Sequence, residues 1–162
     1  MAAAAFAWVA VCVGCDSPPV VQPIPFNHLI HKQNDVKCID CHEHAEDGAR
    51  ASISRPSDCL TCHDADITEN PAAKPYIEQI RRAAKDGAEI PWVRLYELPA
   101  HVYFSHRRHT AIAGLDCAAC HGDIGQRPKP APYPAGRTLD MDDCMDCHEE
   151  RGVMNDCAWC HR

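Results

Sequence analysis

The sequence predicts a mainly α-helical chain, with few short helices, long loops and little or no sheet. Three observations support this. Five copies of a five-residue motif, Cys-x-x-Cys-His, are distributed over 162 residues. Proline and glycine are frequent (13 and 8 residues) and interrupt long elements. Aromatic residues make up only 6% of the chain, so its own side chains offer little for a conventional core.

The repeated motif indicates what organises the fold. In Cys-x-x-Cys-His the two thiols can form thioethers to a porphyrin, and the adjacent histidine can bind its iron, as in c-type haem attachment. A structural zinc site would gather four ligands in paired hairpins, and a disulfide framework has no reason to place histidine after every second cysteine. A thioredoxin-like motif would occur once, near a βαβ pattern that is missing here. We therefore expect five haem c groups, whose porphyrins supply much of the apolar core.

The five motifs provide ten thioether cysteines and five iron-binding histidines. The cysteines are Cys38, Cys41, Cys59, Cys62, Cys117, Cys120, Cys144, Cys147, Cys157 and Cys160. The histidines are His42, His63, His121, His148 and His161. Short helices are expected around these motifs, with long loops between them.

Six more histidines could bind the irons from the other side. They are His28, His31, His44, His101, His106 and His109. Five irons need five second ligands, so one histidine is spare. Met141, three residues before Cys144, is a further candidate, and a methionine ligand would raise the potential of that haem. An iron closed by two imidazoles can pass electrons but has no place for a substrate.

The chain contains an internal repeat. Phe26-Asn27-His28-Leu29-Ile30-His31 precedes the first motif, and Phe104-Ser105-His106-Arg107-Arg108-His109 precedes the third. Each phrase is followed by a motif, a longer loop and another motif, and the second copy adds the motif at Cys157. Histidines three residues apart share one side of a helical turn, so one turn could serve two haems. We divide the chain into a leader and tether (1–21) and one haem domain (22–162), made of a first unit (22–70), a spacer (71–100) and a second unit (101–162).

Two segments between the motifs have patterns of their own. Residues 75–86 are expected to form an amphipathic helix, with Ile77, Ile80 and Ala84 on one face and Gly87 as its stop. Residues 127–136 contain four prolines and are expected to form an exposed, extended loop.

The phrase Phe-x-His-x-x-His ahead of Cys-x-x-Cys-His resembles the cytochrome c3 and c7 class of small multihaem cytochromes. The resemblance implies that the first histidine of each phrase caps the next haem in the chain, so that His28 serves the first haem and His106 the third. It also implies that His31 and His109 cap two of the second, fourth and fifth haems. One iron is then left for His101, His44 or Met141, and we favour His101.

A longer likeness covers residues 22–162. The phrases at 22–28, 90–99, 102–106, 117–122 and 156–162 are similar to the pentahaem cytochrome subunit of alternative complex III, a bacterial quinol oxidoreductase. The resemblance implies a periplasmic electron-relay subunit or a free-standing relative of one. The expected partners are therefore redox proteins, such as a membrane quinol-oxidising complex or another cytochrome.

The first residues are expected to act as an export signal. Residues 2–14 are apolar but shorter than the roughly 20 residues that span a bilayer. Val13-Gly14-Cys15 resembles the end of a lipoprotein signal, with Cys15 as the acylated residue. A cleaved secretory signal and an uncleaved anchor are the alternatives. Each of them places the haem domain on the periplasmic side of the cell envelope, with a lipid anchor at Cys15 as the expected membrane attachment.

Charge argues against some partners. The formal net charge is −7, so nucleic acid and anionic lipid surfaces are poor partners. Six acidic residues surround the fourth motif and would suit a basic redox partner, unless they are simply a solvated face. They are Asp140, Asp142, Asp143, Asp146, Glu149 and Glu150.

The sequence therefore favours an electron-transfer protein of the respiratory chain over an enzyme. The alternative is a multihaem reductase or oxidase with one open haem iron. Because an open iron is high-spin, the electronic spectrum of the oxidised protein separates these two functions.

Overall fold

A computed structural model describes residues 18–65 and 67–161. Those residues form short helices joined by long loops, with no strands and a single isolated bridge between Val102 and His161. The predicted fold class is confirmed. In order, the elements are α1 (His28–Gln33), α2 (Cys38–Cys41), α3 (Pro56–His63), α4 (Lys74–Asp86), η1 (Arg108–Ile112), α5 (Ala118–His121), η2 (Ile124–Gln126), α6 (Met141–Glu150) and α7 (Cys157–Cys160).

Two of the cysteine-containing helices begin at an aspartate cap. Asp140 accepts a hydrogen bond from the Asp143 backbone N–H at the start of α6, and Asp156 accepts one from the Ala158 N–H at the start of α7. Each cap satisfies a backbone donor that a helix start leaves without a partner. Two of the six acidic residues near the fourth motif, Asp140 and Asp143, are thus engaged within the fold, since Asp143 also accepts from Thr138 and the Leu139 N–H.

Helix α4 is the longest element and forms as predicted. It covers Lys74–Asp86 and ends at Gly87, whose φ of 64° is the left-handed conformation that glycine tolerates best at a helix end. Ile80 on its inner face joins Ile24 and Ile90 in a small buried cluster, with Leu60 of α3 and Trp92 packed against it. This cluster fixes α4 against α3.

The protein's own side chains bury little else. Among the described residues no large side chain is fully buried, and Trp159 is 59% exposed. A chain of this length with so small a core needs a further source of buried apolar surface. The sequence predicted that porphyrins supply it.

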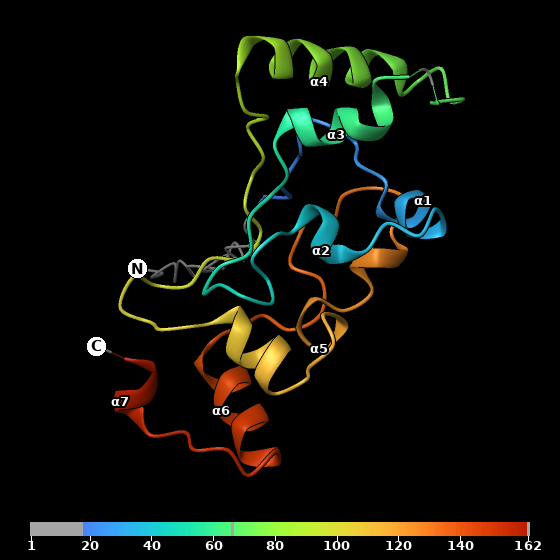
Figure 1. Ribbon diagram of the computed structural model, residues 1–162. Coiled ribbons are helices and arrows are strands. Elements are labelled where there is room, and N and C mark those ends of the chain that lie inside the picture. The colour runs from blue at the N-terminus through green and yellow to red at the C-terminus, as the bar shows by residue number, and fades with distance from the viewer. Residues whose placement is uncertain (1–17, 66, 162) are drawn as a thin grey trace, which may run out of the picture.

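The molecule is elongated, and neighbours in space are not always neighbours in sequence (Figure 1). Helices α3 and α4 lie at one end, α1, α2 and α5 in the middle, and α6 and α7 at the other end. No helix within residues 18–65 and 67–161 combines the length and apolar character needed to cross a bilayer. The predicted lipid anchor at Cys15 falls within residues 1–17, outside the described residues, and the division into haem units and spacer stays a prediction.

The proline-rich segment 127–136 is an irregular loop with several bends, and it is not uniformly exposed. Ala131 and Ala135 are buried, at 1% and 5% exposure, while Pro132 and Pro134 face solvent. The Val20 N–H donates to the Pro132 carbonyl across 2.8 Å. The expectation of an exposed loop was therefore wrong at the two alanines, whose small side chains allow the segment to pack against the body.

Gly136 of this segment and Gly122, directly after the third motif, allow the two backbones to cross at close range. A Cβ added to Gly136 would lie 2.5 Å from the Cys120 carbonyl oxygen and 2.6 Å from the Gly122 backbone nitrogen. Gly136 also has a φ of 91°, which side-chain-bearing residues rarely adopt. Beside it, the Arg137 N–H donates to the Cys120 carbonyl at 3.0 Å. The crossing therefore requires glycine.

We predict that Gly136→Ala lowers the free energy of unfolding of the haem-loaded protein by about 2–4 kcal/mol, because it adds a left-handed penalty and an overpacked contact. Gly87→Ala is the matched control, since its φ is also positive but no atom lies within 4 Å of the added Cβ. It should cost about 1 kcal/mol. Denaturant titrations of both variants measure the difference, and equal losses would show that the crossing is not tight.

Candidate haem-binding sites

The motif cysteines are accessible. Each of the ten is exposed or half-buried, and none of them is in a disulfide. In α2, α3, α6 and α7 both cysteines of a motif lie within the helix, and in α5 the first one, Cys117, is the N-cap. Because helical residues three apart share one face, the two thiols of a motif point to the same side. Each motif therefore presents two thiols and a histidine at one short helix.

Each of four motif histidines faces a histidine from outside the motifs. The ring centroids are 6.1 Å apart for His31 and His63, 6.4 Å for His106 and His121, 6.2 Å for His109 and His148, and 5.4 Å for His101 and His161. The fifth motif histidine, His42, lies close enough to His28 to influence its ionisation. The structure thus brings eight of the eleven histidines together in four ring pairs, and it places His42 near His28.

Hydrogen bonds set the tautomer of five of these histidines. In each, Nδ1–H donates to a backbone carbonyl, which can only accept, so that Nε2 keeps its lone pair free for a metal. The bonds are His31 to Asn27 (2.7 Å), His42 to Ser52 (3.1 Å), His106 to Ala49 (3.2 Å), His109 to Ser105 (2.8 Å) and His148 to Met154 (3.1 Å). His63 Nδ1 lies 3.3 Å from the Thr68 hydroxyl.

His28 is distinguished by its burial. Its Nδ1 is buried and has no hydrogen-bond partner. Burial first, and then the neighbouring His42 and His31, lower the pKa of His28 to about 4. Burial also lowers the pKa values of His63 and His121. These imidazoles are therefore neutral near pH 7, which is the form that binds a metal.

The phenylalanine of each repeated phrase positions the two histidines that follow it. Phe26 stacks on His31 (4.4 Å between centroids, 16° between planes) and meets His28 edge-on (4.7 Å, 77°). Phe104 makes the same contacts with His109 (4.5 Å, 19°) and His106 (4.9 Å, 90°). The two copies of the repeat therefore share one local geometry, in which one aromatic ring orients two imidazoles.

The three candidates for the last iron ligand, His101, His44 and Met141, differ in their surroundings. His101 stacks on His161, with planes 24° apart. His44 lies in an exposed turn with a φ of 65°, and its Nδ1 is 2.9 Å from an Asp47 carboxylate oxygen. Among the described residues His44 has no ring contact with another histidine, and the Met141 residue is 63% exposed at the start of α6. The structure thus places His101, but neither of the other two, opposite a motif histidine.

Thiols of different motifs are also neighbours. Burial first, and then a thiol of another motif, raise the pKa of each of four cysteines. The neighbouring thiols are Cys41 beside Cys59, Cys38 beside Cys117, Cys147 beside Cys120, and Cys160 beside Cys144. The motifs therefore follow one another in space as second, first, third, fourth and fifth, along the axis from α3 to α7 (Figure 1).

Sequence reasoning did not predict the contacts of two residues that support the sites, Tyr96 and Arg81. Tyr96 in the spacer meets His121 edge-on at 4.7 Å, and its hydroxyl donates to the Ala135 carbonyl. Arg81 donates to the carbonyls of His63 and Asp64, at 2.9 and 3.1 Å, so it caps the end of α3. No spacing pattern marks these residues, because each reaches a motif that is distant in the chain.

Two comparisons with known proteins found similarities. The family of cytochrome c7 and related cytochrome c matches residues 102–162. The chain is also 28% identical, over 165 residues, to the menaquinone reductase multihaem cytochrome c subunit of Nitratidesulfovibrio vulgaris, a match that covers 87% of this chain and 77% of that protein. Together with the five motifs, these similarities identify a multihaem c-type cytochrome, an electron-transfer protein with covalently bound haem rather than an enzyme with its own substrate.

Proposed function

We propose that this cytochrome relays electrons through five haem c groups, each closed by two histidines, as a subunit or partner of a quinone-linked respiratory complex. The facing imidazole pairs carry the proposal. Imidazole nitrogens bind first-row metals at about 2 Å, so two imidazoles on opposite sides of one metal have centroids roughly 6 Å apart. Three of the observed pairs are 6.1 to 6.4 Å apart, and the fourth, at 5.4 Å, is slightly closer.

We use these pairs to propose the second ligands. On this proposal His28 serves the first motif, His31 the second, His106 the third, His109 the fourth and His101 the fifth. The free Nε2 atoms of the hydrogen-bonded histidines suit this role. His44, paired with Asp47 at the surface, is the spare histidine, and Met141 is not a ligand.

The chain's own residues would keep the five centres in one row. Bound haem supplies one-electron chemistry at its iron. The turn with His28 and His31 joins the first and second motifs, and the turn with His106 and His109 joins the third and fourth. The neighbouring thiols Cys38 and Cys117 bring the first and third motifs together. With both axial positions held by histidine, a substrate has no place to bind, which favours relay over reduction or oxidation of a small molecule.

The assignment to a quinone-linked complex rests on two similarities. The relative from Nitratidesulfovibrio vulgaris is named as a subunit of a menaquinone reductase, and the longer phrases of the sequence resemble a quinol oxidoreductase subunit. Residues 2–14 and Cys15 would place the chain on the periplasmic side, tethered by lipid. The acidic residues of α6 that are not engaged in caps, Asp142, Asp146, Glu149 and Glu150, would face a basic partner surface.

The haem number has a direct measurement. The intact mass of the holoprotein should exceed that of its polypeptide by five haem groups, because each motif supplies two thiols. Replacing both cysteines of one motif by serine should reduce the excess to four. A wild-type mass with four groups or fewer would contradict the count.

The last ligand is tested by a matched pair of variants. His101→Ala should turn one haem in five high-spin in the oxidised protein, because its iron loses an axial imidazole. His44→Ala should leave all five low-spin. Electronic and EPR spectra measure both. A high-spin centre in the His44→Ala variant, or a near-infrared band of methionine ligation in the wild type, would refute the ligand set.

The partner proposal is tested with tagged full-length chain purified from detergent-solubilised membranes of its own host. We expect menaquinol to reduce the haems in this preparation, because the chain is purified with its quinone-linked complex. Chain stripped of its partners should be reduced far more slowly. Recovery of the wild-type chain alone, in the soluble periplasmic fraction, would contradict both the complex and the tether.

A further inference from the structure

The two haem units hold each other's ligand turns. The first ligand turn, residues 26–31, lies against η2, which follows the third motif, and the Leu29 N–H donates to the Arg127 carbonyl at 3.1 Å. The second ligand turn, residues 104–110, lies against residues 45–49, which follow the first motif. Each turn is therefore positioned by the segment that follows the first motif of the other unit.

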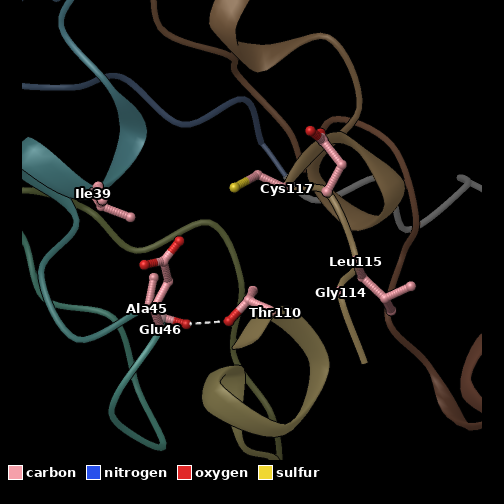
Figure 2. A pocket seen from close by; sticks show the side chains of 8 residues that line it. Ile39, Ala45, Glu46, Thr110, Gly114, Leu115 and Cys117 are labelled. Atoms are coloured by element: carbon pink, nitrogen blue, oxygen red, sulfur yellow. Dashed lines mark hydrogen bonds between the residues drawn. The ribbon is translucent and has the colours of Figure 1, made fainter. Parts of the chain in front are cut away.

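Residues 45–49, which we term the seat, contact the second ligand turn through several hydrogen bonds. The Ala49 carbonyl accepts from the backbone N–H of His106 at 3.0 Å and from its Nδ1–H at 3.2 Å. The Gly48 carbonyl accepts from the Arg107 N–H at 2.9 Å. At the other end of the seat, the Thr110 hydroxyl lies 2.6 Å from the carbonyl oxygen of the buried Ala45 (Figure 2). The same hydroxyl lies 2.9 Å from the carbonyl oxygen of His106, within the turn. The turn is thus held at both of its ends.

Thr110 distinguishes the second turn from the first. The corresponding residue of the first repeat is Lys32, and that turn is an ordinary α-helix, whereas residues 108–112 form a π-helical turn. Short π segments are frequent at functional sites. Thr110 also borders a cavity of 320 Å³ that Ile39 of the first motif and Cys117 of the third line as well (Figure 2). The hydroxyl therefore acts where the two haem units meet.

We infer that Thr110 is a positioning residue for His106: by anchoring the second ligand turn on the seat, it fixes the rotation of the His106 imidazole. That ring lies within 4° of parallel to His121, the closest alignment among the four measured pairs. The others are 24°, 31° and 61° apart. Without the bond to Ala45, the second ligand turn is held on the seat only by the bonds of His106 to Ala49 and of Arg107 to Gly48, and the His106 ring can then tilt relative to His121. The inference rests on the proposed closure of the irons by two histidines.

The alignment of two axial imidazoles has a spectroscopic signature. Near-parallel planes give a rhombic low-spin EPR signal, whereas strongly crossed planes give a highly anisotropic one. The His106–His121 centre should therefore contribute the most rhombic signal of the four measured pairs, and its position reports the rotation of His106. Activity is not needed for this measurement.

The test compares Thr110→Val with Thr110→Ser in the full-length holoprotein. Valine keeps the shape of threonine but cannot donate, so the most rhombic signal should shift towards larger anisotropy and its midpoint potential should change. Serine keeps the hydroxyl and should restore both to wild-type values. The signals of the His31–His63 and His101–His161 centres should stay in place and serve as internal controls. An unmoved signal in Thr110→Val, or an equal shift in Thr110→Ser, would overturn the role of Thr110.

A second variant covers the case in which Thr110→Val does not assemble. Gly48→Ala crowds the seat and leaves Thr110 in place, because the new Cβ would lie 3.0 Å from both the Cβ and the carbonyl oxygen of His44. It should move the same signal, and no movement would overturn the inference. Failure of the proposed function can be distinguished from failure of this inference. If the irons were not all closed by two ligands, the wild-type protein itself would contain a high-spin centre.

Discussion

The pairing of motif histidines with histidines from other segments is the constraint on which the rest of the structure depends. Four such pairs lie within 6.4 Å, and each joins different segments of the chain. A fold organised around these pairs needs no long helices or sheet. Short cysteine-bearing helices and loops are sufficient, and the small Ile24–Ile80–Ile90 cluster fixes only the end that contains α4.

A second set of contacts makes the two repeats depend on each other. Each ligand turn rests on a segment that follows a motif of the other repeat, so the position of each set of imidazoles depends on both repeats. Phe26 and Phe104 set the local geometry within each turn. The contacts with the opposite repeat set where each turn lies. The local geometry of each ligand turn is thus set within its own repeat, and the position of that turn is set by the other repeat.

Local features could be predicted from the sequence, and long-range ones could not. The motif helices, α4 with its Gly87 end and the two His-x-x-His turns follow from short patterns. The sequence also shows that there are enough histidines to pair with the motif histidines, but it does not show which of them form pairs. His44 and His101 differ only in their spatial neighbours, which are an exposed Asp47 for His44 and His161 for His101. Buried Ala131 and the Thr110 bond to Ala45 likewise depend on segments that no spacing rule connects.

The spatial order of the motifs follows from this interlocking and differs from their order in the chain. After the first motif the chain leaves the middle of the molecule and forms α3, which contains the second motif. It then returns through α4 and residues 87–107 to the third motif. The first motif consequently lies between the second and the third, with Cys41 beside Cys59 and Cys38 beside Cys117. On the proposed function, exchange with partners would then take place at the two ends of the row. One end is covered by α4, and the other lies beside the exposed acidic face of α6, so the two ends differ in charge and shape and suit different partners.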